Sequence, residues 1–216
     1  MPSDASTRHA PAKFVVGTGA PLDWAMAAWR EVAPELNLVP VPLAASADPD
    51  EVEALLAGAD LAGATAFVTA DARFLNFRRL ERMGLLRMRG LPMPPLVCRG
   101  AVVAADAVIG ENSYIHPGAV VGQGCKLGFN TVIGAGARIG HGAVIGNSCW
   151  IEDGVVVGRE ARIGSHVTLG SGVIVGNGVE IGKLCVIDKP GKIEAKVAAR
   201  TFIHSSPAHP MVIVGS

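Results

Sequence analysis

A six-residue period runs through the middle of the chain, from Val97 to Val186. Fifteen consecutive blocks of six residues fit this stretch without an insertion, and every block begins with Val, Ile or Leu. Eleven of the fifteen second positions are Gly, and every fifth position is Ala, Ser, Cys, Thr or Val. A fixed period this short indicates a repeat architecture, and a hexapeptide period predicts a parallel β-helix.

The period also predicts a geometry. Three blocks close one triangular coil, so eighteen residues return the chain to the same face of a prism. The fifteen blocks therefore make about five coils over residues 97–187, and the coils stack about 4.8 Å apart. The branched first residues and small fifth residues face the interior, where only small groups fit beside large ones. Gly at the second position suits a corner that needs a positive φ or a close approach of two backbones.

Composition limits the classes of partner and the compartment. The 216 residues carry 19 Lys and Arg and 19 Asp and Glu, so nothing favours nucleic acid or an anionic membrane as a partner. Residues 1–12 lack the apolar core of a signal peptide and are expected to be a disordered tail. Cys125, Cys149 and Cys185 fall at inward fifth positions, where a thiol acts as a small hydrophobe. Reduced core cysteines predict a cytoplasmic protein.

Strand and helix patterns alternate three times before the repeat begins. Strands are expected at residues 13–19, 36–43 and 64–70, the second at a sheet edge because it contains two prolines. Helices are expected at residues 21–33, 48–56 and 72–83. This alternation predicts a small, Rossmann-like parallel α/β domain over residues 13–90, joined to the prism by a linker at 91–96.

Ligands of such sheets bind at the carboxyl ends of the strands. This rule nominates Gly17, Thr18 and Gly19 after the first strand and Asp71 after the third, with the loop 44–48 between them. The alternative is that the two glycines only form a tight turn. A nucleotide-binding fingerprint needs a third Gly where this chain has leucine.

Three histidines on the repeat, His116, His141 and His166, are spaced by 25 residues. Because eighteen residues return the chain to one face, a step of 25 places each histidine on a different face. We therefore expect no metal site that joins them within one chain, although a site between subunits stays open. Gly flanks His141 on both sides, which leaves its imidazole accessible and suited to taking a proton near neutral pH. The alternative is a solvated surface histidine.

The run Tyr114–Val121 (YIHPGAVV), followed by Asn130–His141 (NTVIGAGARIGH), resembles a segment of the bacterial sugar acyltransferases that modify nucleotide-linked amino sugars, with which sialic acid O-acetyltransferases are grouped. The resemblance covers about residues 13–187. It implies a left-handed β-helix, a homotrimer, acetyl-CoA as the donor in clefts between neighbouring prisms, and a sugar nucleotide held by the N-terminal domain. It implies no metal.

The resemblance also assigns roles to residues. His141 is then the general base, which takes a proton from an acceptor amine or hydroxyl as that group attacks the thioester. A backbone N–H near Gly158 or Arg159 stabilises the oxyanion. Trp150 and Ser171 are the further contacts to the donor. The function implied is acetyl-CoA-dependent transfer to a sugar in surface polysaccharide synthesis.

This sequence departs from the family pattern at several positions. Gly142 stands where the family typically has Glu after the catalytic histidine, and Trp150 stands where it has a second histidine. The N-terminal glycine run is incomplete, and only Asp48 and Asp50 lie near the usual acidic pair. Two other classes therefore stay open: a non-catalytic trimeric scaffold, and a metalloenzyme like the β-helical carbonic anhydrases. Residues 188–216 show no period and are expected to cap the prism, with a short helix at 193–199.

Overall fold

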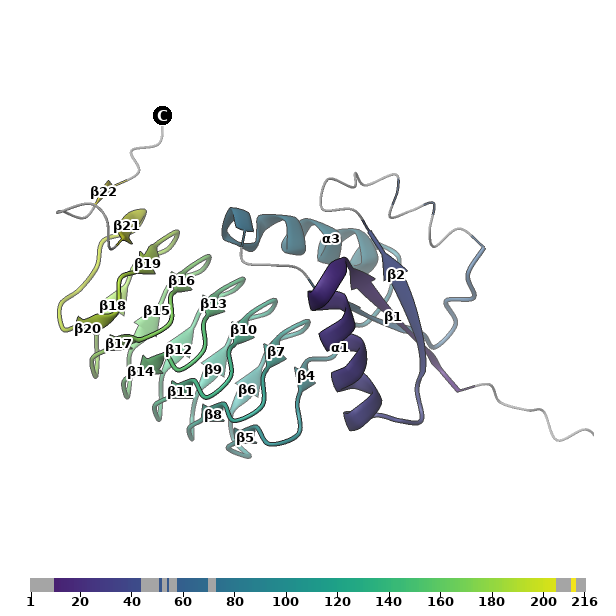
Figure 1. The fold of residues 1–216 in the computed structure, drawn as a ribbon, viewed down its shortest axis with the longest axis horizontal. Coiled ribbons are helices and arrows are strands. Elements are labelled where there is room, and N and C mark those ends of the chain that lie inside the picture. Colours follow the sequence, from purple (N-terminus) through teal and green to yellow (C-terminus); the bar gives the residue numbers. More distant parts are fainter. Residues whose placement is uncertain are drawn as a thin grey trace, which may run out of the picture.

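The structure is a computed structural model that describes residues 10–43, 51, 54, 58–69, 73–204 and 211–212. A small α/β unit lies at one end of the molecule, and a solenoid of short strands extends away from it (Figure 1). The solenoid is a parallel β-helix, as the hexapeptide period predicts. It has about six turns, more than the five expected, because the stacking of strands continues beyond residue 187. Within the described residues, no helix combines the length and apolar character needed to cross a membrane.

The α/β unit contains a three-stranded parallel sheet in the order β2-β1-β3. Its elements are β1 (Ala12–Gly17), α1 (Gly19–Val32), β2 (Asn37–Pro42), β3 (Thr65–Val68), the 3-10 turn η1 (Arg73–Asn76) and α3 (Phe77–Met88). All three predicted strands are confirmed, and the proline-containing β2 is an edge strand as expected. The expected loop at 44–48 and most of the expected helix at 48–56 lie outside the described residues.

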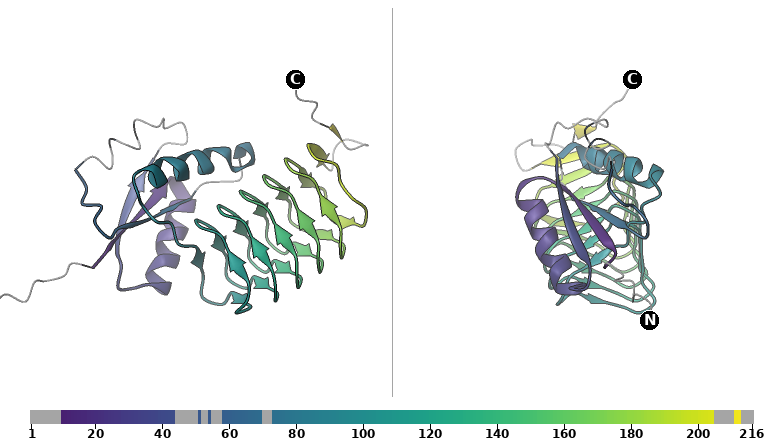
Figure 2. Two further views of the ribbon diagram at one scale, coloured as in Figure 1. Left: turned by 180° about the vertical axis from the view of Figure 1, so that it is seen from behind. Right: turned by 90° about the vertical axis from the view of Figure 1, so that its right-hand side faces the viewer.

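The two helices cover opposite faces of this sheet (Figure 2). Side chains of β1 alternate between them: Phe14 and Val16 pack in the cluster that contains Met83 of α3, and Val15 packs with Met26 of α1. The third helix differs from the prediction of residues 72–83, because it begins later and runs to Met88. Leu75 and Asn76 have φ of 50° and 61°, so the chain makes a left-handed break between η1 and α3.

The solenoid has three faces. Face 1 contains β4 (Leu96–Val97), β7 (Tyr114–Ile115), β10 (Val132–Ile133), β13 (Trp150–Ile151), β16 (Thr168–Leu169), β19 (Val186–Asp188), β21 (Thr201–His204) and the antiparallel β22 (Met211–Val212). Face 2 contains β5 (Val102–Val103), β8 (Val120–Val121), β11 (Arg138–Ile139), β14 (Val156–Val157), β17 (Val173–Val175) and β20 (Gly191–Ile193). Face 3 contains β6 (Val108–Ile109), β9 (Lys126–Leu127), β12 (Val144–Ile145), β15 (Arg162–Ile163) and β18 (Glu180–Ile181).

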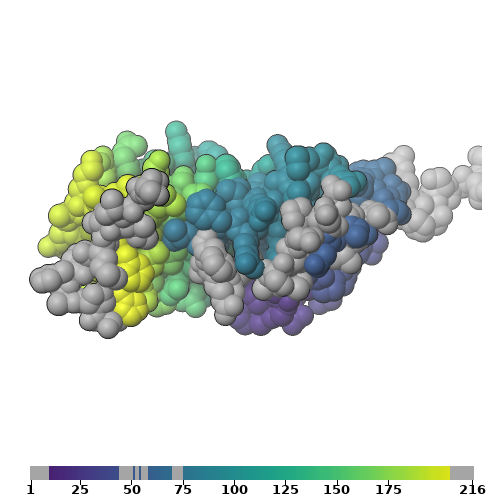
Figure 3. All heavy atoms as spheres, turned by 90° about the horizontal axis from the view of Figure 1, so that it is seen from above, coloured from purple at the N-terminus to yellow at the C-terminus, as the bar shows by residue number. Residues whose placement is uncertain are grey.

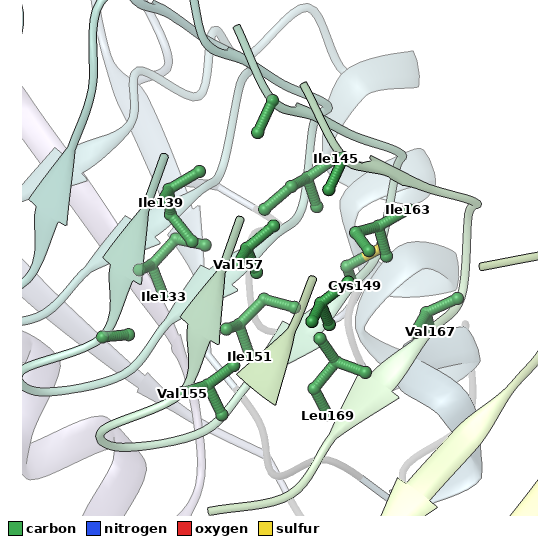
Figure 4. Close-up of a cluster of buried hydrophobic side chains, with 14 of the residues drawn as sticks. Ile133, Ile139, Ile145, Cys149, Ile151, Val155, Val157, Ile163, Val167 and Leu169 are labelled. Carbon is green, nitrogen blue, oxygen red and sulfur yellow. The ribbon is translucent and has the colours of Figure 1, made fainter. Parts of the chain in front are cut away.

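We call the bend between faces 1 and 2 corner 1, that between faces 2 and 3 corner 2, and that between faces 3 and 1 corner 3. First-position residues of the blocks fill the interior, as Ile133, Ile139 and Ile145 show (Figure 4). All four cysteines are free and buried, as expected for reduced core residues. Second-position glycines serve close approach: a Cβ on Gly110 would lie 2.3 Å from the backbone nitrogen of Phe129 in the next coil.

The helix predicted near the C-terminus is absent from the structure. Residues 193–199 form no helix; β20 ends at Ile193, and Val197 makes a parallel bridge to Ile181. The partner of Ile174 lies eighteen residues on, at Lys192, whereas the partner of Ile181 lies sixteen residues on, at Val197. This turn is therefore two residues shorter than the others. The six-residue period ends here, although the strands continue to stack through hydrogen bonds.

A buried polar network joins the α/β unit to corner 3. Arg79 of α3 is 1% exposed and donates hydrogen bonds to the carbonyl oxygens of Val68 (3.0 Å), Asn130 (3.0 Å) and Asn112 (2.6 Å). Asn76 donates to the carbonyl oxygen of Ser148 (3.1 Å). Seen from above, the blue-teal atoms of α3 lie against the green atoms of the solenoid (Figure 3). This network sets the position of α1 and α3 relative to the prism.

Candidate functional site

Each of the three predicted surface histidines lies on a different corner of the prism. His116 follows β7 at corner 1, His141 follows β11 at corner 2, and His166 precedes β16 at corner 3. The geometric prediction that they do not converge is therefore confirmed. The described residues contain no group of three or more His, Cys, Asp or Glu that could hold a metal ion.

Corner 3 is occupied by the α/β unit. The ring of His166 stacks on Phe77 with 4.1 Å between centroids, and its Nδ1 lies 2.9 Å from the carbonyl oxygen of Leu75. This histidine therefore holds the turn η1 against the prism.

A cavity of about 600 Å³ lies between α1 and corner 1, and we call it the corner-1 pocket. Three aromatic side chains contribute to its wall: Trp24 from α1, and Tyr114 and Trp150 from face 1. Its polar lining consists of Glu31, Cys98, His116, Glu152, Asp153 and Ser171. Aromatic walls with a few convergent polar groups are typical of small-molecule sites.

The floor of the pocket is built on Tyr114. The ring of His116 stacks on it with centroids 4.0 Å apart, and Phe67 of β3 meets it edge-on at 5.7 Å. Burial raises the pKa of Tyr114 above its usual range and raises the pKa of the Cys98 thiol to about 11. Burial lowers the pKa of His116 in spite of the opposing effect of Asp153. At neutral pH the floor is therefore uncharged.

Two carboxylates that line the pocket are held in place by neighbouring coils of the solenoid. Glu152 Oε2 accepts hydrogen bonds of 3.0 Å from both the backbone N–H and the hydroxyl of Ser171. Asp153 Oδ1 accepts one of 2.7 Å from the backbone N–H of Ala135. Each carboxylate thus commits one oxygen to the protein.

His141 is exposed at corner 2 and belongs to a recurrent contact between coils. Its Nδ1 accepts a hydrogen bond of 3.1 Å from the backbone N–H of Gln123, eighteen residues earlier. The side-chain oxygens of Asn147, Asp153 and Asn177 accept the same bond from Phe129, Ala135 and Arg159. We call this series the corner ladder. The next residue, Gly142, has φ of +68°, which explains why a glycine suits this place.

The backbone N–H groups of both predicted oxyanion donors make hydrogen bonds within the chain. The backbone N–H of Gly158 donates to the carbonyl oxygen of Val175 (2.8 Å), and that of Arg159 donates to Asn177 Oδ1 (2.9 Å). Within the described residues, the backbone N–H of His141 has no acceptor. The residue of the next coil that would supply its acceptor, eighteen residues on, is Arg159, and an arginine side chain accepts no hydrogen bond. This N–H is therefore an open donor at corner 2.

The structure divides the predicted donor-binding residues between two corners. Trp150 and Ser171 line the corner-1 pocket, whereas Gly158 and Arg159 lie on corner 2 with His141. Within one chain these two groups do not form a single site.

The residues at the carboxyl end of β1 have different structural roles. Gly17 is explained by packing, because a Cβ there would lie 2.5 Å from Thr69 Cγ2. Thr18 is the N-cap of α1, but its side chain makes no capping hydrogen bond, and Gly19 is exposed with φ of +56°. Asp71 lies outside the described residues.

Sequence reasoning missed the corner-1 pocket, although the repeat carries a signal for it. Only four of the fifteen second positions are not Gly: Cys98, Ala104, His116 and Glu152. Three of these four line the pocket. Departures from a strict repeat thus mark the place where the solenoid makes a cavity instead of a plain corner.

Comparisons with known proteins agree with this fold. The hexapeptide repeat of succinyl-transferase matches residues 100–135, 127–163 and 160–188. A comparison with curated protein sequences gives no match. The acetyltransferase domain of PglB from Neisseria gonorrhoeae, solved with acetyl coenzyme A, has a TM-score of 0.79 and 17% identity over 94% of this chain and 100% of that one.

Two further solved structures share the architecture. PerB from Caulobacter crescentus, solved with CoA and GDP-perosamine, has a TM-score of 0.74 and 20% identity over 93% of this chain and 97% of its own. AntD, an N-acyltransferase from Bacillus cereus solved with dTDP and 3-hydroxybutyryl-CoA, has a TM-score of 0.50 and 14% identity over 60% of this chain and 86% of its own. The chain thus has the hexapeptide repeats and the solenoid fold of sugar N-acetyltransferases, and the resemblance seen in the sequence is confirmed at that level.

Proposed function

We propose that the chain is an acyl-CoA-dependent acyltransferase that moves an acyl group, in the simplest case acetyl, to an amine or hydroxyl of a nucleotide-linked sugar. The fold shared with PglB and PerB supports this class, because those structures hold acetyl coenzyme A or CoA. The observation that carries the proposal is the division of the site between corner 1, with its pocket, and corner 2, with an exposed His141.

A homotrimer of left-handed prisms would unite these two halves. Corners 1 and 2 are the two edges of face 2, whose outward side chains include Val102, Val120 and Ile174, exposed at 61%, 38% and 41%. Exposed aliphatic side chains in register along one face are typical of an interface. If face 2 turns toward a threefold axis, corner 1 of one subunit meets corner 2 of the next. The partner subunit's His141 would then complete each corner-1 pocket.

The chemistry at this seam follows from the groups present. A nucleophile in the pocket attacks the thioester carbonyl, and His141 accepts the proton that the nucleophile loses. The open backbone N–H of His141 donates to the oxyanion of the tetrahedral intermediate. In the neutral ring the lone pair lies on Nδ1, which Gln123 occupies. Proton uptake therefore requires this exposed ring to rotate away from Gln123.

We place the nucleotide at the α/β unit, residues 13–90, in a Rossmann-like arrangement. The amino end of α1 carries no acidic residue in its first turn, and the Thr18 hydroxyl makes no capping bond. A helix amino terminus of this kind favours a phosphate group. Asp71 is proposed as a further contact in this place, and the solenoid, residues 97–187, holds the donor. We place the reaction in the cytoplasm, as part of surface polysaccharide synthesis.

A transfer assay with acetyl-CoA and a nucleotide-linked amino sugar, followed by release of free CoA thiol, tests the proposal. Turnover by the purified chain supports it. The second candidate is a trimeric scaffold without activity, and the engagement of His141 Nδ1 in the corner ladder favours it. Calorimetry separates the two, because a scaffold shows no acetyl-CoA binding at millimolar concentration.

A further inference from the structure

The corner-1 pocket has an unusual balance of charge for a site next to a phosphorylated substrate. Its lining includes the carboxylates of Glu31, Glu152 and Asp153 and the aromatic rings of Trp24, Tyr114 and Trp150. No lysine or arginine is among the residues that line it, in the part of the chain that the structure describes. Phosphate groups are therefore repelled from this pocket, and a cation is attracted to it.

The carboxylates can serve a ligand directly. Glu152 and Asp153 each commit one oxygen to a backbone N–H, and the other oxygen has no partner within the described residues. Glu31 lies in the last turn of α1, where the helix dipole adds partial negative charge. Aromatic faces beside carboxylates are the usual surroundings of a bound ammonium group.

His116 adds a proton acceptor to this cation site. Within the described residues its ring nitrogens make no hydrogen bond, and its only ring contact is the stack on Tyr114. It occupies a block position where glycine predominates, so the repeat itself does not call for an imidazole there. Because burial lowers the pKa of His116, the ring is neutral at pH 7 and has a free lone pair.

We propose that the corner-1 pocket binds the acceptor through a primary ammonium group, and that His116 accepts the first of the two protons that this ammonium loses. The proposal rests on the proposed transferase function and deepens it, because it selects N-acylation over O-acylation. In this scheme His116 at corner 1 accepts one proton and His141 at corner 2 accepts the other.

The proton count supports two acceptors. Transfer from an acyl-CoA thioester to R–NH₃⁺ yields the amide R–NH–CO–R′, CoA–SH and one free proton. His116 takes the first proton from R–NH₃⁺, which frees the nitrogen lone pair for attack on the carbonyl, and later releases that proton to solvent. After the C–N bond forms, His141 takes the second proton from nitrogen. As the C–S bond breaks, that proton goes to the departing thiolate. A hydroxyl acceptor would need only the second step.

The main test is the pH dependence of His116→Gln. The titratable and charged groups around this ring are Arg79, Cys98, Tyr114, Glu31, Glu152 and Asp153. With a nucleotide-linked amino sugar, we expect kcat/KM at pH 7 to fall by about 10²-fold. We expect the loss to shrink as the pH rises, because solvent then removes the first proton. His141→Asn is the control, and its loss should not recover with pH. A wild-type rate, or a loss that is equal at all pH values, overturns the role of His116.

A binding experiment isolates the ammonium site from the reaction. Glucosamine and glucose are titrated separately into the His141→Asn protein, with tryptophan fluorescence as the readout because Trp24 and Trp150 line the pocket. We expect glucosamine to bind at least about tenfold more tightly. The preference should disappear in Glu152→Gln, which keeps an oxygen for Ser171. Equal binding of the two sugars overturns the ammonium site. Selective binding without any acyl transfer by the wild-type chain would instead overturn the transferase function and leave the site in place.

Discussion

The Nδ1 atom of His141 accepts a hydrogen bond of 3.1 Å from the backbone N–H of Gln123, one coil away. Asparagine makes the same contact elsewhere on the prism: Asn177 Oδ1 accepts from Arg159 at 2.9 Å, and Asn147 Oδ1 from Phe129 at 3.2 Å. His141 thus has a structural role in the corner ladder besides its proposed chemical role. The two roles can be separated, because an amide oxygen replaces Nδ1 in the ladder but cannot act as a base.

We predict that His141→Asn keeps the thermal stability of the wild type and lowers turnover by about 10²-fold or more. His141→Ala should lose turnover to the same degree and should also lose about 1 kcal/mol of stability, because the N–H of Gln123 then lacks its acceptor. Turnover with acetyl-CoA and thermal denaturation measure the two effects. Wild-type turnover in the asparagine variant would remove His141 from the mechanism.

Arg79 is predicted to be the main link between the α/β unit and the prism. Its guanidinium donates to three carbonyl oxygens at 2.6–3.0 Å and has no carboxylate partner among the residues that the structure describes. Arg79→Met leaves these oxygens without that donor, and we expect the free energy of unfolding to fall by about 3–5 kcal/mol. Arg79→Lys keeps the charge but not the planar fork, so its loss should be intermediate. Urea denaturation measures both variants, and equal stability of Arg79→Met and the wild type contradicts this role.

Lys13 is predicted to destabilise the fold at neutral pH. It is 1% exposed, its Nζ has no hydrogen-bond partner within the described residues, and it lies 3.9 Å from the centre of the Trp29 ring. Burial lowers the pKa of Lys13 to about 8, below the 10.5 of an unfolded chain. Between these values the unfolded state binds more protons, so this residue makes the free energy of unfolding rise with pH from about 8 to 10.5.

Lys13→Met should therefore stabilise the protein at pH 7 by about 1–2 kcal/mol, because it removes a buried charge and keeps a side chain of similar length. The gain over the wild type should shrink as the pH rises through this window. The comparison uses the difference between the two proteins at each pH, because other buried groups titrate there as well. A constant difference from pH 7 to 10.5 would rule out the titration of Lys13 as the cause.

Prediction from sequence succeeded where the same contact repeats along the chain. It failed where a feature depends on tertiary packing. Every block from Val97 to Val186 repeats the same inward side chains, so the strands, their register and the three separate histidine corners follow from the period. The last turn was missed because two fewer residues separate Ile181 from Val197. The corner-1 pocket needs Trp24 and Glu31 of α1 against the solenoid, and no spacing within the repeat encodes that approach.

A last prediction concerns the glycines of the solenoid. It separates two reasons for a glycine: the close approach of neighbouring coils and a left-handed backbone conformation. A Cβ on Gly110 would lie 2.3 Å from the backbone nitrogen of Phe129, whereas a Cβ on Gly136 would meet nothing within 4 Å. Gly136 instead has φ of +65°, which costs an alanine about 1 kcal/mol. Gly110→Ala should therefore lose about 3 kcal/mol or more, since the next coil must move, and Gly136→Ala only about 1 kcal/mol. Urea denaturation of the two variants measures this order. The reverse order would mean that glycine is selected for left-handed backbone at the corners and not for the stacking distance between coils.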